Sequence, residues 1–309
     1  MKIQIKKILC ASDLSDFSNI TIPIGVSLAR AFNADLYICH IVDLTATAIY
    51  HDGFYTPIEM QDQAAAYAEE TLAQIVGAAD VNCQTLIQTG HPADSVTRLA
   101  EEKKIDLVIA ATHGRSGLKR LVIGSVTERL MRTLACPLLI VRSPDPRITA
   151  PGDLESKFKR ILVGCDFSAA SDQALQYGLN LAQELQSELH LVHVIAPAVY
   201  ENLLKSSATS APGRSPDLRE QLKARLAARL PEESYHWCDP KTQILAGRPF
   251  EEITKYAVIH KMDLIVLGAR GLGLVEKLSV GSTTDRVARQ APCPLLSVGA
   301  QPGPADKPS

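Results

Sequence analysis

Short apolar runs alternate along the chain with longer stretches in which apolar residues recur every three or four positions. The runs at 8–11, 36–41, 107–110 and 138–141 have the length and composition of strands buried on both faces of a sheet. Helical periodicity separates such runs. An example is the apolar stripe formed by Leu218, Leu222, Leu226 and Leu230, beside which Arg219, Lys223 and Arg229 are expected to face water. This alternation predicts an α/β fold with a doubly wound, mainly parallel sheet.

The order of elements occurs twice because the sequence repeats itself. Residues 6–18, "KKILCASDLSDFS", match residues 159–171, "KRILVGCDFSAAS", and further matches follow up to "ACPLLIVR" and "PCPLLSVG". Copy one is predicted at 1–144 and copy two at 158–300. The proline-bearing segment 145–157 is expected to be a linker and 301–309 a flexible tail. We therefore expect two tandem domains, each a five-stranded mainly parallel sheet with helices on both faces.

A glycine-rich loop follows one apolar strand in each copy. In copy two the spacing is Gly268-x2-Gly271-x9-Gly281-Ser282. Ser282 and Ser125 are expected to be helix N-caps, because Asp285 and Glu128 follow them at the spacing of a capping box. A helix start after a glycine presents backbone N–H groups at the positive end of the helix dipole. The loops therefore predict anion sites suited to phosphate, at the carboxyl edge of the sheet.

Two common nucleotide motifs are excluded. In the Gly-x-Gly that starts at Gly271, Glu276 stands where a dinucleotide fingerprint has its third glycine, and the chain contains no G-x-x-x-x-G-K-[ST]. A plain connecting loop is the remaining alternative, and the recurrence of the x9 spacing in both copies argues against it.

Composition and charge exclude several further classes of protein. The 309 residues are 46% apolar and 21% charged with a formal charge of −2, which gives no reason to expect nucleic-acid binding. No apolar run is long enough to cross a membrane and no secretory signal is evident, so we expect a cytoplasmic protein. Seven scattered cysteines without C-x-x-C predict reduced core thiols rather than disulfides or zinc.

These motifs together resemble the universal stress protein family, in its ATP-binding branch and in a tandem form. The resemblance rests on the complete G-x2-G-x9-G-(S/T) of copy two, "ASDLS" and "GCDFS" after the first strands, the "H-[IV]-[VI]" ends of the second strands, and "CPLL-x-V" in the last strands. It covers nearly the whole chain. It implies a fold like that of adenine nucleotide alpha-hydrolases and a site for an adenine nucleotide in each domain.

The resemblance also implies which residues bind. In copy two, Asp166 and Val194 would hold the nucleoside, while Gly268, Gly271, Gly281, Ser282 and the backbone of Thr283 would hold ribose and phosphates. The matching positions in copy one are Asp13, Ile41, Ala111, Gly114, Gly124, Ser125 and Val126. Copy one departs from the family motif at Ala111, where a methyl group could block the ribose if the backbone must approach it closely. Copy two departs at Cys165, where the family leads one to expect Thr or Ser.

Several polar residues have a structural alternative. Asp13 and Asp166 could cap the helices that begin near Ser15 and Ser168, a role compatible with ligand contact. His40 and His193 at the strand ends are expected to be structural. His113 and Arg270 share one loop position, where a cation could reach a phosphate or simply be solvated.

Three classes of function follow. The favoured one is a stress-response or regulatory protein that binds ATP, AMP or ADP, with Mg²⁺ able to accompany ATP, and acts by occupancy with little turnover. No catalytic residues and no metal site in the protein itself are expected. The alternatives are a scaffold that acts through protein partners without nucleotide, and a nucleotide-processing enzyme such as a slow ATPase. The resemblance further implies a pseudo-dimer of the two domains, with a homodimer and a protein partner as further expectations.

Overall fold

The computed structural model describes residues 3–43, 57–76, 81–112, 123–142, 158–197, 218–269 and 280–299. The chain divides into two compact units, 4–154 and 155–309 together with the first three residues. Each unit is described by itself. The predicted linker, the predicted tail and the loop residues Gly114 and Gly271 lie outside the described residues, as do His113 and Arg270. The domain limits at 144 and 158 therefore stay predictions.

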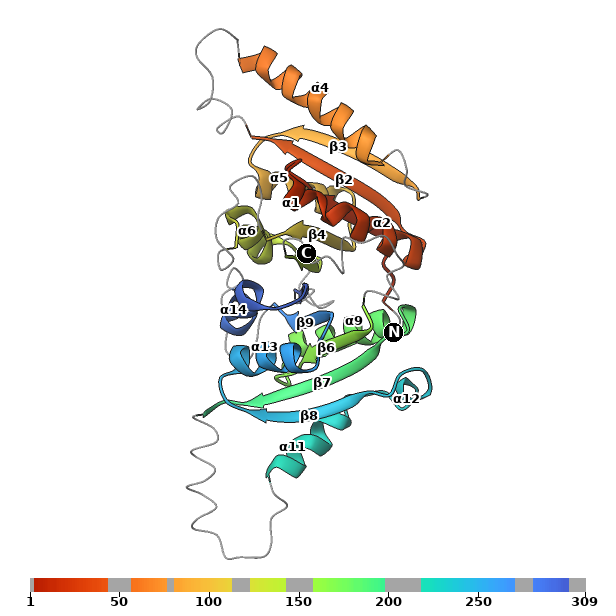
Figure 1. Cartoon of the computed structure of the whole chain (residues 1–309), viewed down its shortest axis with the longest axis vertical. Helices are drawn as coiled ribbons and strands as arrows, with labels where there is room; N and C mark the ends of the chain where they lie inside the picture. The colour runs from red at the N-terminus through yellow and green to blue at the C-terminus, as the bar shows by residue number, and fades with distance from the viewer. Residues whose placement is uncertain are drawn as a thin grey trace, which may run out of the picture. The chain divides into compact units, whose positions relative to one another are not determined.

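Copy one contains five parallel strands connected by helices (Figure 1). The strands are β1 Lys7–Ala11, β2 Asp35–Val42, β3 Cys83–Thr89, β4 Leu107–Ala111 and β5 Leu138–Val141. The described helices are α1 Asp16–Asn19, α2 Thr21–Phe32, α4 Pro57–Val76, α5 Pro92–Glu102 and α6 Ser125–Thr133. The strand order is β3-β2-β1-β4-β5.

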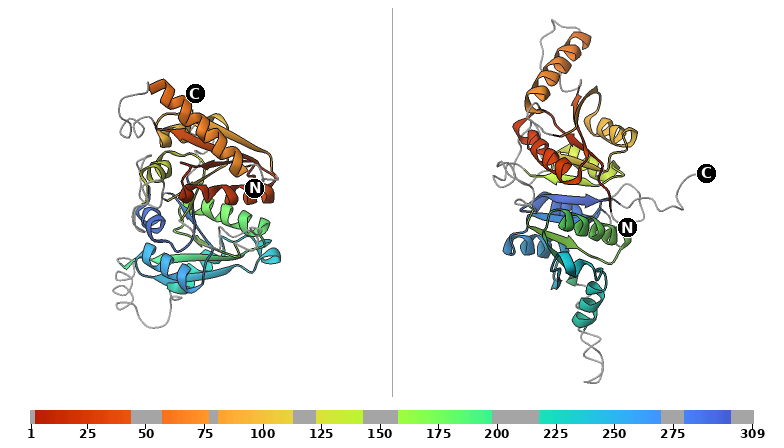
Figure 2. Two further views of the ribbon diagram at one scale, coloured as in Figure 1. Left: turned by 45° about the horizontal axis from the view of Figure 1, so that its top comes forward. Right: turned by 90° about the vertical axis from the view of Figure 1, so that its right-hand side faces the viewer.

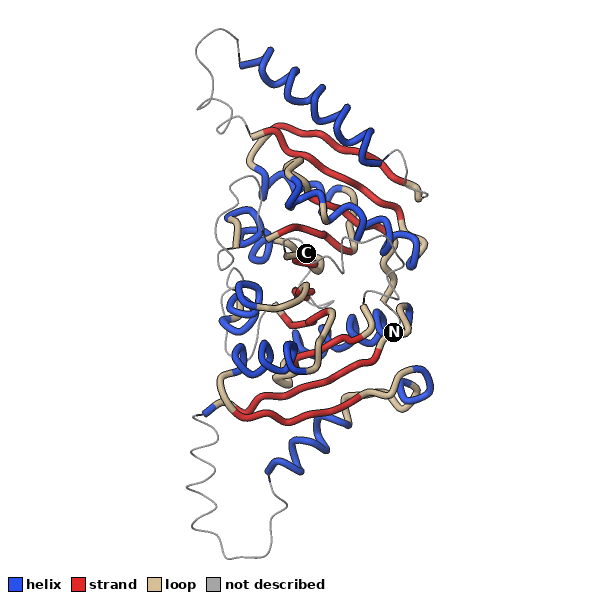
Figure 3. The backbone as a smooth tube through the Cα atoms, viewed as in Figure 1, coloured by secondary structure: helices blue, strands red, loops and turns tan. Residues whose placement is uncertain are grey.

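Copy two repeats this arrangement, and the alternation of strand and helix is visible along both copies in Figure 3. Its strands are β6 Arg160–Gly164, β7 Glu188–Ile195, β8 Lys241–Ala246, β9 Leu264–Gly268 and β10 Leu295–Val298. Its described helices are α9 Ala169–Glu184, α11 Leu218–Ala227, α12 Ser234–Trp237, α13 Pro249–Ile259 and α14 Ser282–Gln290. The order β8-β7-β6-β9-β10 mirrors that of copy one, and the four strand pairs of this order are parallel.

Helices cover both faces of each sheet (Figure 2). Right-handed crossovers account for this, since β1–β2–β3 proceeds in one direction and β4–β5 in the other. The central strands of copy one are buried along their middle residues, with Ile8, Leu9 and Ile109 at 0% exposure. Their continuous apolar sequences are therefore explained, and the predicted five-stranded doubly wound fold is confirmed. The order of strands reverses between β1 and β4 and between β6 and β9, so each copy has its switch point there.

The repeat is visible in the backbone as well as in the sequence. Every described residue with positive φ has its counterpart in the other copy, although the side chains differ. The pairs are Leu14 and Phe167, Asn33 and Gln186, Lys104 and Lys261, and Gly90 and Gly247. The two copies thus share a main-chain path down to single unusual dihedrals.

The first helix is where the two copies differ. In copy one, α1 ends and α2 begins at Ile20, three residues before Pro23. Proline has no N–H to donate to the carbonyl of Asn19 and its ring crowds that carbonyl, which explains the break. Copy two has Gln176 at the position of Pro23, and α9 continues for 16 residues without interruption.

The prediction for the leucine stripe of copy two was partly wrong. Helix α11 ends at Ala227, so Leu230 lies beyond it, although Leu226 and Leu230 are both buried. Arg229 does not simply face water, because it forms an ion pair with Asp172 of α9. The helix is shorter than the periodicity indicates because the chain turns after Ala227.

The cysteines agree with the prediction of core thiols. All seven are free and five of them are buried. Burial raises the pKa of the Cys39 thiol to about 12, so this thiol stays protonated at neutral pH. Among the described residues, no helix is long and apolar enough to cross a bilayer.

Candidate functional site

The loop after the first strand of copy one is organised around the carboxylate of Asp13. Its Oδ1 accepts hydrogen bonds from the backbone N–H of Ser15 at 3.0 Å, from the Ser15 hydroxyl at 2.5 Å and from the Ser18 hydroxyl at 2.6 Å. Ser15, not Asp13, is the N-cap of α1. Asp13 therefore acts one step earlier, by fixing the residue that caps the helix.

Asp166 has the matching role in copy two. Its Oδ1 accepts from the backbone N–H of Ser168 at 3.0 Å and from the Ser168 hydroxyl at 2.5 Å. Ser168 is the N-cap of α9 and accepts in turn from the N–H of Ser171. Both aspartates thus have a fixed orientation at the carboxyl end of the central strand, which is compatible with a ligand contact.

The residue after each aspartate is strained. Leu14 and Phe167 both have a φ of 64°, a left-handed conformation that side chains with a β-carbon rarely adopt. Such strain persists only where the surrounding contacts fix it, and it is typical of ligand-binding positions.

A histidine from the second strand holds this loop in both copies. The Nδ1–H of His40 donates to the carbonyl of Ser12 at 2.9 Å, and that of His193 to the carbonyl of Cys165 at 2.7 Å. A carbonyl can only accept, so Nδ1 carries a proton in both histidines. The structural role predicted for these histidines agrees with this geometry.

A second pair of hydrogen bonds closes the base of each glycine loop. In copy two, the N–H of Gly281 donates to the carbonyl of Ala269 and the hydroxyl of Thr284 to the carbonyl of Gly268, both at 2.7 Å. These two bonds, here called the loop clamp, connect the end of β9 to the first turn of α14. Copy one has the same clamp, formed by the Gly124 N–H with the Thr112 carbonyl (2.7 Å) and the Thr127 hydroxyl with the Ala111 carbonyl (2.6 Å).

The predicted caps of the two following helices were wrong. The N-caps of α6 and α14 are Gly124 and Gly281, neither with a side-chain cap, and Ser125 and Ser282 are the first helical residues. The clamp explains the shift. The glycine N–H donates to the end of the strand, and the glycine carbonyl accepts the first hydrogen bond of the helix, which Asp285 donates in copy two. The serine side chains are exposed, and no side chain among the described residues caps the first helical N–H groups.

Gly268 is required by packing in this structure. A β-carbon at Gly268 would lie 2.8 Å from the backbone carbon of Ala170 and 2.9 Å from its oxygen, in the first turn of α9. Gly268 is not among the residues with positive φ. The glycine of copy two is therefore explained by the approach of a helix. Ala111 stands at this position in copy one, where the first helix is broken.

The remaining predicted positions lie around the same edge. Ile41 is buried in β2 and Val194 is half-buried in β7. Val126 and Thr283, both half-buried, belong to the first turns of α6 and α14. Because β1 pairs with β4 and β6 with β9, the aspartate loop and the glycine loop of each copy leave neighbouring strands at the switch point.

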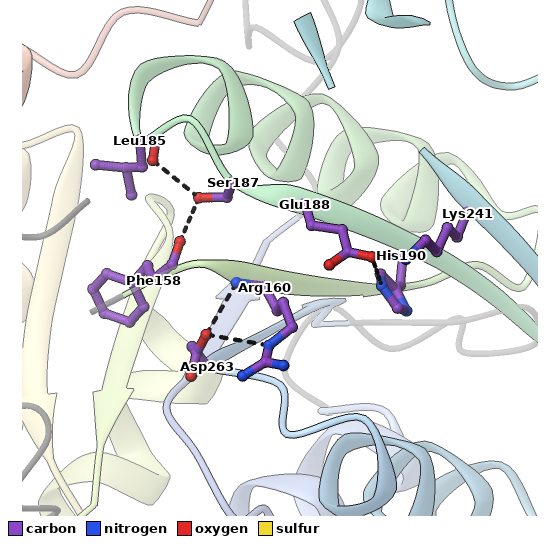
Figure 4. A network of polar contacts seen from close by, with 8 residues as sticks. All are labelled: Phe158, Arg160, Leu185, Ser187, Glu188, His190, Lys241 and Asp263. Carbon is purple, nitrogen blue, oxygen red and sulfur yellow. Dashed lines mark hydrogen bonds and ion pairs between the residues drawn. The ribbon is translucent and has the colours of Figure 1, made fainter. Parts of the chain in front are cut away.

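A polar network occupies the opposite, amino-terminal edge of copy two (Figure 4). Asp263 accepts from the N–H of Arg160 at 3.0 Å, and the Ser187 hydroxyl donates to the carbonyl of Phe158. Glu188 contacts both His190, with its Oε1 3.0 Å from Nε2, and Lys241.

His190 is also bound from the helix side, since Nδ1 lies 2.9 Å from the Tyr256 hydroxyl. Burial lowers the pKa of His190 to about 4. Copy one has Tyr37 and Leu99 at the positions of His190 and Tyr256, so this pair belongs to copy two alone. Among the described residues, no group of three His, Cys, Asp or Glu is arranged to hold a metal ion.

Sequence reasoning missed the threonines of the clamp. The signal was present, because "IGSVTERL" and "VGSTTDRV" share a threonine three residues after the glycine. It was overlooked because a hydroxyl in the first helical turn is usually interpreted as a capping group, not as a bond to a distant strand.

Comparison with known proteins shows that both copies match the same protein family. Residues 4–142 and 157–299 each match the Universal stress protein family. Universal stress protein Slr1230 of Synechocystis sp. is 23% identical over 320 residues, which cover 94% of this chain and 99% of that protein. Universal stress protein MJ0531 of Methanocaldococcus jannaschii is 30% identical over 141 residues, which cover 45% of this chain and 83% of that protein.

A solved structure has the same fold over the whole chain. The crystal structure of a universal stress protein from Archaeoglobus fulgidus aligns with a TM-score of 0.69 at 22% identity. The alignment covers 96% of this chain and 99% of that one.

Proposed function

The chain belongs to the universal stress protein family and carries the family's domain twice, and on this premise we propose that it binds an adenine nucleotide. Copy two, which has every glycine of the nucleotide motif, is the principal site. The proposed ligands are ATP, ADP or AMP, and Mg²⁺ would enter with the phosphates of ATP.

The loop clamp of copy two is the observation that carries the proposal. It fixes the first turn of α14 against the end of β9, so the N–H groups of Ser282 and Thr283 are held at the carboxyl edge of the sheet. The helix dipole gives this turn a partial positive charge. A phosphate is the ligand that such a preorganised turn favours, and the exposed Ser282 hydroxyl adds a donor.

The nucleoside end is proposed at Asp166 and Val194. The carboxylate is oriented by Ser168 before any ligand arrives, which reduces the entropy lost on binding. Val194 offers an apolar surface from the neighbouring strand β7. The switch point between β6 and β9 is where ligands of doubly wound sheets bind.

Copy one is proposed as a second site. Its clamp has the same two hydrogen bonds, and Asp13, like Asp166, is oriented by the serine that caps the following helix. Copy two needs glycine at Gly268 because α9 packs closely there. The alanine at the matching position of copy one, Ala111, is therefore not by itself evidence that copy one has lost its nucleotide site. Two nucleotides per chain is therefore the expected maximum stoichiometry.

The proposed action is occupancy. A nucleotide would connect the aspartate loop to the first turn of α14 and thereby change the surface available to a partner. Four expectations from the sequence stay predictions: the pairing of the two domains, a homodimer, a protein partner and a cytoplasmic location.

A count of bound nucleotide tests the proposal. The full-length chain is purified without added nucleotide and denatured, and released adenine nucleotides are identified and counted per chain, with ATP titrated by calorimetry in parallel. One or two equivalents are expected. No released nucleotide together with no calorimetric binding would overturn the proposal in favour of a partner-binding scaffold. Steady phosphate release in the presence of Mg²⁺ would instead favour the slow ATPase.

A further inference from the structure

Besides the aspartate and histidine hydrogen bonds that both copies share, the strained loop of each copy has contacts of its own. In copy one these additional contacts are polar. The hydroxyl of Ser12 accepts from the backbone N–H of Leu14 at 2.9 Å, lies 3.1 Å from the Ser18 hydroxyl, and donates to Asn19 Oδ1 at 2.7 Å. A hydroxyl that both donates and accepts can fix a strained backbone N–H in this way.

Copy two lacks this hydroxyl. Cys165 replaces Ser12, and its thiol lies 3.8 Å from the Ser171 hydroxyl and near the N–H of Phe167. Burial raises the pKa of this thiol, so it stays protonated and is a weak acceptor for the N–H of Phe167. The strained φ of 64° is nevertheless the same as in copy one.

In copy two, contacts of the Phe167 ring stand where copy one has the Ser12 hydroxyl. The ring centroid is 4.6 Å from the His193 ring centroid and 4.2 Å from the guanidinium carbon of Arg225. Arg229, one turn further on, lies 5.8 Å from the same centroid and pairs with Asp172 in the first turn of α9. Helix α11 therefore reaches the aspartate loop through Arg225, while Arg229, two residues beyond the end of α11, binds the following turn to α9.

The consequence for Asp166 is direct. Asp166 precedes Phe167, so the dihedrals of Phe167 determine how Asp166 lies relative to Ser168, whose N–H and hydroxyl orient the carboxylate. His193 contacts the ring and is itself bound to the carbonyl of Cys165. Arg225, exposed and on a long side chain, adds a cation–π contact to the same ring.

We propose that Arg225 is a positioning residue for the nucleoside end of copy two: by stacking on Phe167 it maintains the strained loop that presents Asp166, in place of the serine hydroxyl that does so in copy one. The inference rests on the proposed nucleotide binding. It makes the affinity of copy two dependent on helix α11, whereas the affinity of copy one depends on Ser12.

The test uses the full-length chain with Gly124→Val in copy one, where an added β-carbon would lie 3.2 Å from the Thr112 carbonyl and disturb the clamp. ATP and inorganic tripolyphosphate are titrated by calorimetry. Arg225→Ala is expected to weaken ATP binding about fivefold, because that factor corresponds to the free energy of an exposed cation–π contact. Tripolyphosphate binding should be unchanged. Arg225→Lys is expected to retain most of the ATP affinity. Lys223→Ala, an exposed change on the same helix, is the matched control.

A rescue variant separates positioning from simple helix docking. Cys165→Ser in the Arg225→Ala chain restores the hydroxyl of copy one and should recover the ATP affinity, although α11 still lacks its arginine. Equal losses for ATP and tripolyphosphate, or no recovery with Cys165→Ser, would overturn the proposal.

Amide hydrogen exchange of Phe167 and Ser168 in the unliganded protein gives a second readout that needs no nucleotide. Exchange should rise in Arg225→Ala and fall again with Cys165→Ser. If the parent chain binds no ATP but exchange follows this pattern, nucleotide binding fails as the function while the positioning role stands. Unchanged exchange in Arg225→Ala would overturn the positioning role itself.

Discussion

A β-carbon placed on Gly268 would lie 2.8 Å from the backbone carbon of Ala170, so the end of β9 and the first turn of α9 leave no room for a methyl group. Gly268→Ala is therefore expected to destabilise copy two by about 1–3 kcal/mol through overpacking. The single tryptophan of the chain, Trp237, lies in copy two. Urea unfolding followed by tryptophan fluorescence measures the effect in that copy.

The reciprocal change in copy one is the control. Ala111→Gly should lower the free energy of unfolding of copy one by at most about 1 kcal/mol, because it only increases the backbone entropy of the unfolded chain. A neutral Gly268→Ala would show that α9 moves away without cost and that the glycine has a reason other than packing.

The loop clamp gives a second prediction. Thr284→Val keeps the shape of the side chain and removes the hydroxyl that bonds the Gly268 carbonyl at 2.7 Å. Loss of this bond should lower the free energy of unfolding of copy two by about 1 kcal/mol and weaken ATP binding there, because the first turn of α14 is less fixed. Tryptophan fluorescence and calorimetry measure the two effects. Thr127→Val, the same change in copy one, should leave the fluorescence transition where it is; an equal shift would contradict the assignment to separate clamps.

The unbroken helix α9 gives a third prediction. Gln176 is exposed in the middle of α9, where Pro23 stands in copy one. Gln176→Pro should cost about 3 kcal/mol, since it removes one helical hydrogen bond and crowds the preceding turn. Circular dichroism and urea unfolding check this. Gln176→Ala is the control, and a proline variant as stable as the alanine variant would show that α9 tolerates the break seen in copy one.

The buried His190 predicts acid sensitivity of copy two. Its pKa is about 4 in the folded protein and near 6.5 in an unfolded chain. Between these values the unfolded state binds more protons, so stability is complete above pH 6.5 and falls as the pH drops to 4, by about 3 kcal/mol in all. The charged or titratable groups around it are Glu188, Lys241, Tyr256, His260 and Arg160.

Urea unfolding at pH 7 and pH 4.5, followed by tryptophan fluorescence, measures this loss. His190→Gln retains a donor and an acceptor but does not titrate, so it should show a smaller difference between the two pH values. An identical difference in the variant would assign the acid sensitivity to other groups.

The fold and the site differ in how far the sequence could predict them. Continuous apolar runs such as Leu107–Ala111 predicted buried strands correctly, because strands covered on both faces have little room for polar residues. The caps were mispredicted, because statistical preference favours Ser282 while the bond from Gly281 to β9 depends on tertiary structure. Arg229 was placed in water because helical periodicity cannot show where α11 ends. The packing reason for Gly268 could not be predicted, because its contact with Ala170 joins residues nearly a hundred positions apart; its contact with a ligand stays a prediction.

Six non-glycine residues in the described part of the chain have a positive φ, and the steric strain of this conformation lowers the stability of the folded protein. Asn33 ends helix α2 in a left-handed conformation, and Lys104, Gln186 and Lys261 adopt it near the ends of α5, α9 and α13. Glycine is the residue that adopts this conformation without a steric penalty. Each of these helix ends is thus a place where protein engineering could make the chain more heat-resistant without touching either glycine loop, whereas the same change at Leu14 or Phe167 would loosen the loop that carries the aspartate.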